Sequence, residues 1–155
     1  MKIGLRNIKT ALAVSLCILL FQMLDRPYPF YACIAAVICM QRSVGHSFRV
    51  GRDRMIGTVI GGLVGLGIYL VFGPAWYATG LGIVMVIALC NHFGKQNSVA
   101  IACIVLIAIT TNLKEVTAVV YAANRVLDTL IGIIVALGIN RVIPSRKAIM
   151  EGKTS

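Results

Sequence analysis

The chain has 155 residues, of which 59% are apolar and only 13% charged, with a mean hydropathy of +0.90 and a net charge of +10. Soluble proteins are about 45–50% apolar and about 25% charged, so one soluble core could not bury this much apolar surface. The composition predicts a single all-α integral membrane domain. Nucleic-acid binding is excluded, because the cations cluster between apolar runs and no soluble domain remains to carry a basic surface.

Six apolar segments follow one another along the chain, and each is expected to be a transmembrane helix. They cover approximately residues 8–24, 28–40, 54–72, 75–91, 98–113 and 122–143. A span needs about 20 residues, so the second segment is short and is expected to be tilted, re-entrant or buried among its neighbours. Prolines 27, 29, 74 and 144 stand at segment ends, where a helix begins or ends. The transmembrane domain is predicted over residues 1–145, with residues 145–155 as a short basic cytoplasmic tail.

The lysines and arginines set the expected orientation. With six spans and a cytoplasmic N-terminus, twelve of the 15 basic residues lie inside and three lie outside, namely Arg26, Lys114 and Arg125. Short cytoplasmic loops of membrane proteins carry such an excess. If the second segment did not cross the membrane, the basic residues between positions 42 and 54 would lie outside the cell, against this rule. We expect a multi-pass protein of the plasma (cytoplasmic, or inner) membrane with both termini in the cytoplasm.

Two stretches of the chain are copies of each other. Residues 54–68 align without gaps on residues 125–139, at an offset of 71, with eight of fifteen positions identical. The tripeptide Ala32-Cys33-Ile34 recurs as Ala102-Cys103-Ile104, at an offset of 70. The repeated unit is therefore three helices, approximately 5–73 and 75–144. Because three is odd, the second copy would enter the membrane from the opposite side, which predicts the inverted repeat of many secondary transporters.

Polar residues at equivalent places in the two copies are the candidate substrate-binding groups. Arg54 and Arg125 begin the two copies, and either they lie on an anion pathway or they anchor helix ends at lipid headgroups. Thr58 and Thr129 also match, and each is expected to bond to the backbone one turn back. Asp128 can pair with Arg125 as a simple helix-end pair or can exchange a proton during transport.

Glycines recur every four residues on the third segment. Gly57, Gly61 and Gly65 share one face, and Gly132 with Ala136 forms a thinner version on the sixth segment. Small residues at this spacing let helix backbones approach closely. Helix packing within the monomer is the simplest interpretation, and a dimer interface or close approach to a substrate stays open.

Catalysis finds no support in the sequence, and neither a cofactor nor a metal is expected. The five cysteines lie within spans without CxxC or CxxH spacing, so disulfides and zinc are not expected. The sequence has no nucleotide-binding glycine loop and no cluster of histidine, cysteine and aspartate. The protein is therefore not predicted to be an enzyme.

The two repeated motifs carry a family resemblance, over approximately residues 5–145. They are Arg54-x-x-Gly57-Thr58-x-x-Gly61 with Gly65, and Arg125-x-x-Asp128-Thr129-x-x-Gly132 ending in Asn140. They resemble the membrane module of the aromatic acid exporter, or fusaric acid resistance, family, which includes plant aluminium-activated malate channels. The resemblance implies efflux or permeation of organic anions, often aromatic carboxylates, through a basic pathway. Members often carry a second module or a cytoplasmic domain; only eleven residues follow Pro144 here, so a homodimer in the lipid bilayer is expected.

The expected function is export of small organic anions, with Arg54 and Arg125 attracting carboxylates near the two mouths of a path between the repeats. Arginine suits this role because its planar fork makes two parallel hydrogen bonds to a carboxylate. Two alternatives remain open, a passive organic-anion channel and a membrane scaffold or subunit whose glycine faces bind partner helices.

Overall fold

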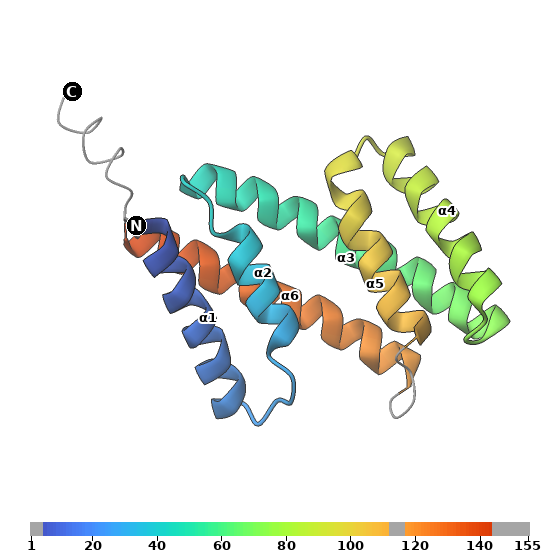
Figure 1. Cartoon of the computed structure of the whole chain (residues 1–155), viewed down its shortest axis with the longest axis horizontal. Helices are drawn as coiled ribbons and strands as arrows, with labels where there is room; N and C mark the ends of the chain where they lie inside the picture. The colour runs from blue at the N-terminus through green and yellow to red at the C-terminus, as the bar shows by residue number, and fades with distance from the viewer. Residues whose placement is uncertain (1–4, 112–116, 144–155) are drawn as a thin grey trace. The chain divides into compact units, whose positions relative to one another are not determined.

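The computed structural model describes residues 5–111 and 117–143, and within them every regular element is a helix (Figure 1). The six α-helices and one 3-10 turn are α1 (Leu5–Met23), α2 (Phe30–Cys39), α3 (Val44–Phe72), α4 (Trp76–His92), η1 (Gln96–Ser98), α5 (Val99–Thr111) and α6 (Ala118–Val142). Each α-helix falls on one of the six apolar segments, so the predicted all-α fold is confirmed. The expected tail, residues 145–155, lies outside the described residues.

The α-helices differ in how far they could reach across a bilayer. α1, α3 and α6 are long and apolar enough to cross one, by length and composition. α2, α4 and α5 are apolar but have 10, 17 and 13 residues. At 1.5 Å per residue α2 covers about 15 Å, against a hydrocarbon core of about 30 Å. The described residues thus form six α-helices, whereas six crossings stay a prediction.

The starts of α3 and α6 correct the sequence prediction. Arg54 and Arg125 were expected at helix ends, but α3 begins at Val44 and α6 at Ala118, ten and seven residues earlier. The sequence predicts a cytoplasmic loop for the polar residues before Arg54, between the second and third apolar segments. They are helical because the Ser43 hydroxyl accepts the backbone N–H of His46 at 3.2 Å and so caps the first turn. Both arginines therefore lie within helices.

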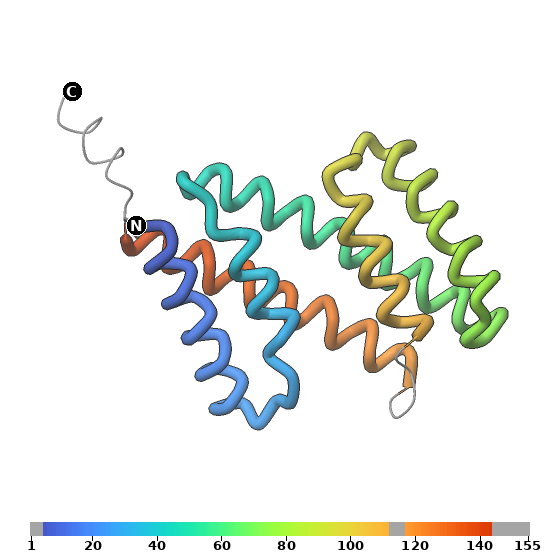
Figure 2. The backbone as a smooth tube through the Cα atoms, viewed as in Figure 1, coloured from blue at the N-terminus to red at the C-terminus, as the bar shows by residue number. Residues whose placement is uncertain are grey.

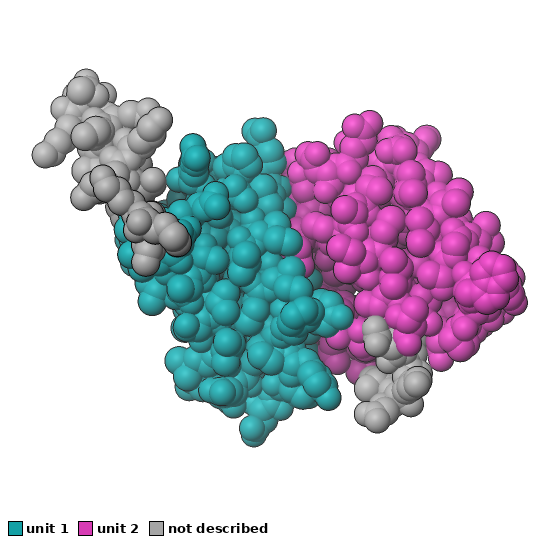
Figure 3. All heavy atoms as spheres, in the orientation of Figure 1, with its two compact units in different colours: residues 1–51, 128–155 teal, residues 52–127 magenta. Residues whose placement is uncertain are grey.

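Two compact units divide the chain, and Figure 3 colours them separately. Unit 1 comprises residues 1–51 and 128–155, and unit 2 comprises residues 52–127. The unit boundaries fall inside α3 and α6, so they differ from the boundaries of the predicted repeats. Unit 1 takes α1, α2 and most of α6, whereas unit 2 takes α4, α5 and most of α3.

Unit 1 is built on a helical hairpin. α1 packs against α2, and the connection between them turns at Asp25 and Tyr28, whose φ angles are 48° and 68° (Figure 2). The part of α6 in this unit lies on α2, because a side chain at Gly132 would collide with the backbone of Ala32 and with Ala35. The fully buried residues of this unit include Ala13 of α1 and Ala32, Ala35 and Ala36 of α2.

Unit 2 has the same kind of organisation. α4 packs against α5, and Gly94, with a φ of 63°, turns the chain between them. The buried core consists of Val86, Cys90, Ala102 and Leu106. The part of α3 in this unit lies on α5, because a side chain at Gly61 would collide with the backbone of Ala102. Each unit therefore contains a two-helix hairpin crossed by a glycine-bearing helix.

Candidate functional site

Arg54 and Thr58 lie one turn apart in α3, within unit 2. The Thr58 hydroxyl donates a hydrogen bond to the Arg54 carbonyl at 3.0 Å, as expected from the sequence. Arg54 is only 7% exposed and Thr58 is fully buried. An arginine that anchors a helix at headgroups extends its charge towards water. The Arg54 side chain instead has little access to solvent, which favours a role inside the protein.

Arg125 is the second candidate cation of unit 2, in the part of α6 that precedes residue 128. It is 8% exposed, and its guanidinium carbon lies 4.3 Å above the centre of the Tyr121 ring. Such cation–π contacts contribute about 0.5–2 kcal/mol. A contact through the face of the guanidinium leaves its edge, where the N–H donors lie, free of the ring. Tyr121 therefore orients Arg125 without competing for its donors.

Asp128 and Thr129 are the candidate residues of unit 1, and both are buried. An Asp128 carboxylate oxygen lies 3.5 Å from Nη1 of Arg26, which follows the last turn of α1. Arg26 also lies over the Phe21 ring, at 5.8 Å from its centre. Sequence reasoning missed Arg26 as a partner of Asp128, because nothing in the local pattern joins residues this far apart in the chain.

The candidate glycines lie against helices of their own units. A side chain at Gly57 would contact Ser98, the last residue of η1, and side chains at Gly61 and Gly65 would contact α5 at Ala102 and Leu106. A side chain at position 57 would collide with the Ser98 carbonyl oxygen. This collision explains why the first copy has glycine at the position where the second copy has Asp128. The four candidate glycine positions thus permit close helix packing inside each unit.

A buried polar network in unit 1 was also missed. Lys9 is only 3% exposed, and its ammonium donates to the side-chain oxygen of Asn140 at 3.0 Å. The Asn140 amide nitrogen in turn donates to the Ser47 hydroxyl at 2.8 Å and to the Gln41 carbonyl at 3.1 Å. Lys9 and Asn140 lie near opposite ends of the sequence, and no rule of residue spacing predicts that two such distant residues form a hydrogen bond.

Metal and thiol chemistry find no site in the described part of the chain. No group of three histidine, cysteine or acidic side chains is placed there to hold an ion. The five cysteines of the chain are free thiols, three of them buried. Arg54 and Arg125 are cations with several N–H donors, and such groups suit binding of an anion.

Comparison with known proteins places the chain in a family. The sequence profile described as aromatic acid exporter family member 1 matches residues 1–143. The chain belongs to the aromatic acid exporter family. The family is one of exporters rather than of enzymes, and membership suggests a membrane transporter.

Curated relatives of this exporter-family chain are longer than it is. It is 29% identical over 142 residues to the UPF0421 protein YgaE of Bacillus subtilis, covering 92% of this chain and 40% of that protein. It is 31% identical over 147 residues to a UPF0421 protein of Staphylococcus epidermidis, covering 91% and 43%. The chain thus spans about two-fifths of the length of these relatives. No solved structure matches it.

Proposed function

We propose that this chain exports small organic anions, aromatic carboxylates above all, across the cytoplasmic membrane, and that it acts as a homodimer. The observation that carries the proposal is the burial of Arg54 and Arg125, two arginines at equivalent repeat positions inside long apolar helices. Charged groups in such helices are costly and generally serve function. Each arginine offers a carboxylate two parallel hydrogen bonds, with Thr58 and Thr129 close by in sequence.

The proposal includes six crossings and an inverted repeat of three helices. Gly61 and Gly132 are equivalent at the repeat offset of 71, and their backbone contacts, Ala102 and Ala32, are equivalent at 70. The same close contact is therefore made in each unit by equivalent residues. This supports a common origin of the two halves, whose opposite orientation follows from the odd number of helices.

Asp128 is the proposed source of directionality. It pairs with Arg26 in unit 1, whereas the equivalent position in the first copy is Gly57. Protonation of Asp128 would release Arg26 for an anion, which couples a proton to the substrate. A passive channel would have no such requirement.

A counterflow assay tests the proposal. Liposomes that contain the purified protein are loaded with aromatic or aliphatic carboxylates, and transport is measured with and without an imposed pH gradient. We expect Arg54→Gln and Arg125→Gln each to lower the rate about tenfold or more, since about 1.4 kcal/mol of lost anion stabilisation is tenfold. Arg42→Gln is the matched control, because Arg42 is exposed beyond the end of α2.

Three results would each contradict part of the proposal. Normal transport by the double variant Arg54→Gln/Arg125→Gln would remove the role of the arginines. Failure to concentrate any anion under a pH gradient would indicate a passive channel. A protein that moves no carboxylate would fit a scaffold, although the glycine faces such a scaffold would offer are already packed on α5 and α2.

A further inference from the structure

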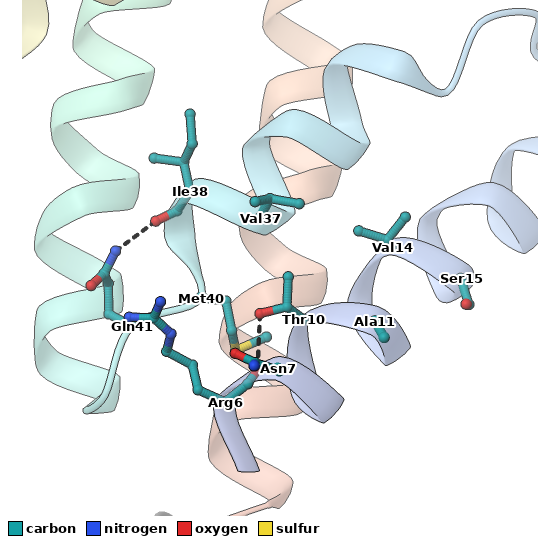
Figure 4. Close-up of a pocket in the computed structure, with 10 residues that line it drawn as sticks. All are labelled: Arg6, Asn7, Thr10, Ala11, Val14, Ser15, Val37, Ile38, Met40 and Gln41. Atoms are coloured by element: carbon teal, nitrogen blue, oxygen red, sulfur yellow. Dashed lines mark hydrogen bonds between the residues drawn. The ribbon is translucent and has the colours of Figure 1, made fainter. Parts of the chain in front are cut away.

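A pocket of about 820 Å³ lies between α1 and α2 in unit 1, and neither Arg54 nor Arg125 is among the residues that line it (Figure 4). Its end nearer the start of α1 is polar and is lined by Arg6, Asn7 and Gln41. Farther along, Val14, Val37 and Ile38 line an apolar wall. Pockets that hold small organic molecules usually measure about 300–1,000 Å³ and combine apolar walls with a few polar groups. The pocket has both properties.

The polar end of the pocket is electropositive. Figure 4 shows the Arg6 side chain extended towards Gln41, and no described residue forms an ion pair with it. Lys9, three residues farther along α1, is buried against Asn140 and does not line the pocket. Among the residues that the structure describes, no acidic side chain lines the pocket. The nearest described acid along α1 is Asp25, beyond the far end of that helix. Charge at this end therefore favours an anion.

The Lys9 network holds the pocket wall at Gln41 in place. The Gln41 backbone N–H donates to the Ser47 hydroxyl at 3.1 Å, and its carbonyl accepts from Asn140. The Gln41 side chain donates to the Ile38 carbonyl at 2.8 Å. A wall fixed by so many bonds needs little reordering when a ligand enters, which lowers the entropic cost of binding.

We infer that this pocket is a loading site for amphipathic carboxylates on their way to export. The carboxylate would lie at Arg6, with the Asn7 amide as a further donor, and the apolar ring would lie against Val14, Val37 and Ile38. The inference rests on the proposed function, because the cytoplasmic position of the pocket follows from the proposed orientation. The headgroup of an anionic phospholipid is the rival occupant.

Direct binding tests the site independently of transport. The full chain is placed in nanodiscs of zwitterionic lipid, and binding of 2-naphthoate is measured by calorimetry. We expect Arg6→Gln to weaken binding about tenfold or more, and Val14→Phe, which fills the apolar wall, to weaken it as well. Arg42→Gln should bind as the wild type does, since Arg42 does not line the pocket. Neutral 2-naphthalenemethanol should bind the wild type more weakly than naphthoate. Circular dichroism shows whether each variant stays helical.

The outcomes separate this inference from the proposed function. Naphthoate binding that depends on Arg6 supports the pocket even if no anion is transported, in which case only the proposed function fails. Transport with naphthoate binding unchanged in Arg6→Gln overturns the pocket and leaves the function standing. Absence of naphthoate binding to the wild type overturns it too. Loss of co-purified phosphatidylglycerol in Arg6→Gln, with naphthoate binding unchanged, would assign the pocket to lipid.

Discussion

Lys9 shows how a single residue can change the interpretation of a helix. The sequence places it at the start of an apolar segment, where lysine usually extends to the headgroups. The structure buries it and gives its ammonium the side-chain oxygen of Asn140 as a partner. A buried ammonium is tolerated only when hydrogen bonds replace part of its hydration. Asn140 is thus what makes a lysine possible here.

The first residue-scale prediction concerns Asn140. Asn140→Ala removes the acceptor of Lys9 and the donors to Ser47 and Gln41, so we expect unfolding to become about 2–4 kcal/mol more favourable. The midpoint of denaturation by sodium dodecyl sulfate measures this change. Asn91→Ala is the control, since Asn91 is exposed. Adding Lys9→Met to Asn140→Ala should recover part of the loss, because the uncompensated charge is then gone. Unchanged stability in Asn140→Ala would show that the network contributes nothing.

At the scale of elements, the glycine contacts decide where α3 and α6 can lie within their units. A methyl group at Gly61 or Gly132 would collide with a backbone, which cannot move aside as a flexible side chain can. Gly67 of α3, by contrast, has open space where its side chain would be. The four-residue spacing in the sequence singled out Gly61 and Gly132 as packing positions and not Gly67, and the structure shows which backbone each of the two meets.

This difference gives a prediction with an internal control. Gly61→Ala and Gly132→Ala should each destabilise the protein by about 1–3 kcal/mol through overpacking. Gly67→Ala should be neutral or stabilise it by up to about 1 kcal/mol, because alanine favours the helix more than glycine does. The same denaturation midpoints report all three variants. Equal effects at positions 61 and 67 would mean that the close contact with α5 is not maintained in the membrane.

The sequence predicted the elements well where local chemistry determines them. Apolar runs located all six α-helices, Pro27 and Pro29 marked the break between α1 and α2, and Pro74 marked the break between α3 and α4. It failed where polar residues are helical, as in the first turns of α3, because hydropathy alone does not register a serine cap. It also could not pair Lys9 with Asn140 or Arg26 with Asp128, since those partners meet only through tertiary packing.

The whole molecule poses the question of how six helices of unequal length lie in a bilayer. α2 is the critical element, because its ten residues would need thinning of the bilayer or burial among neighbours to cross. If it crosses, Ser43 after α2 and Gln96 before α5 lie in the cytoplasm, whereas Tyr28 and Pro74 lie outside. If it does not, Ser43 changes sides with the basic residues that follow it, and Pro74 and Gln96 change sides too as long as α3 and α4 cross. The charge distribution favours crossing.

Cysteine labelling of intact cells tests this topology directly. A membrane-impermeant maleimide added outside should label Tyr28→Cys and Pro74→Cys, and should label Ser43→Cys and Gln96→Cys only after permeabilisation. All four side chains are exposed in the structure, so access within the fold does not limit the reaction. The wild type is the background, since its five cysteines lie in the apolar segments. Labelling of Ser43→Cys from outside would show that α2 does not cross. The two three-helix copies would then lack the opposite orientation on which the inverted-repeat proposal depends.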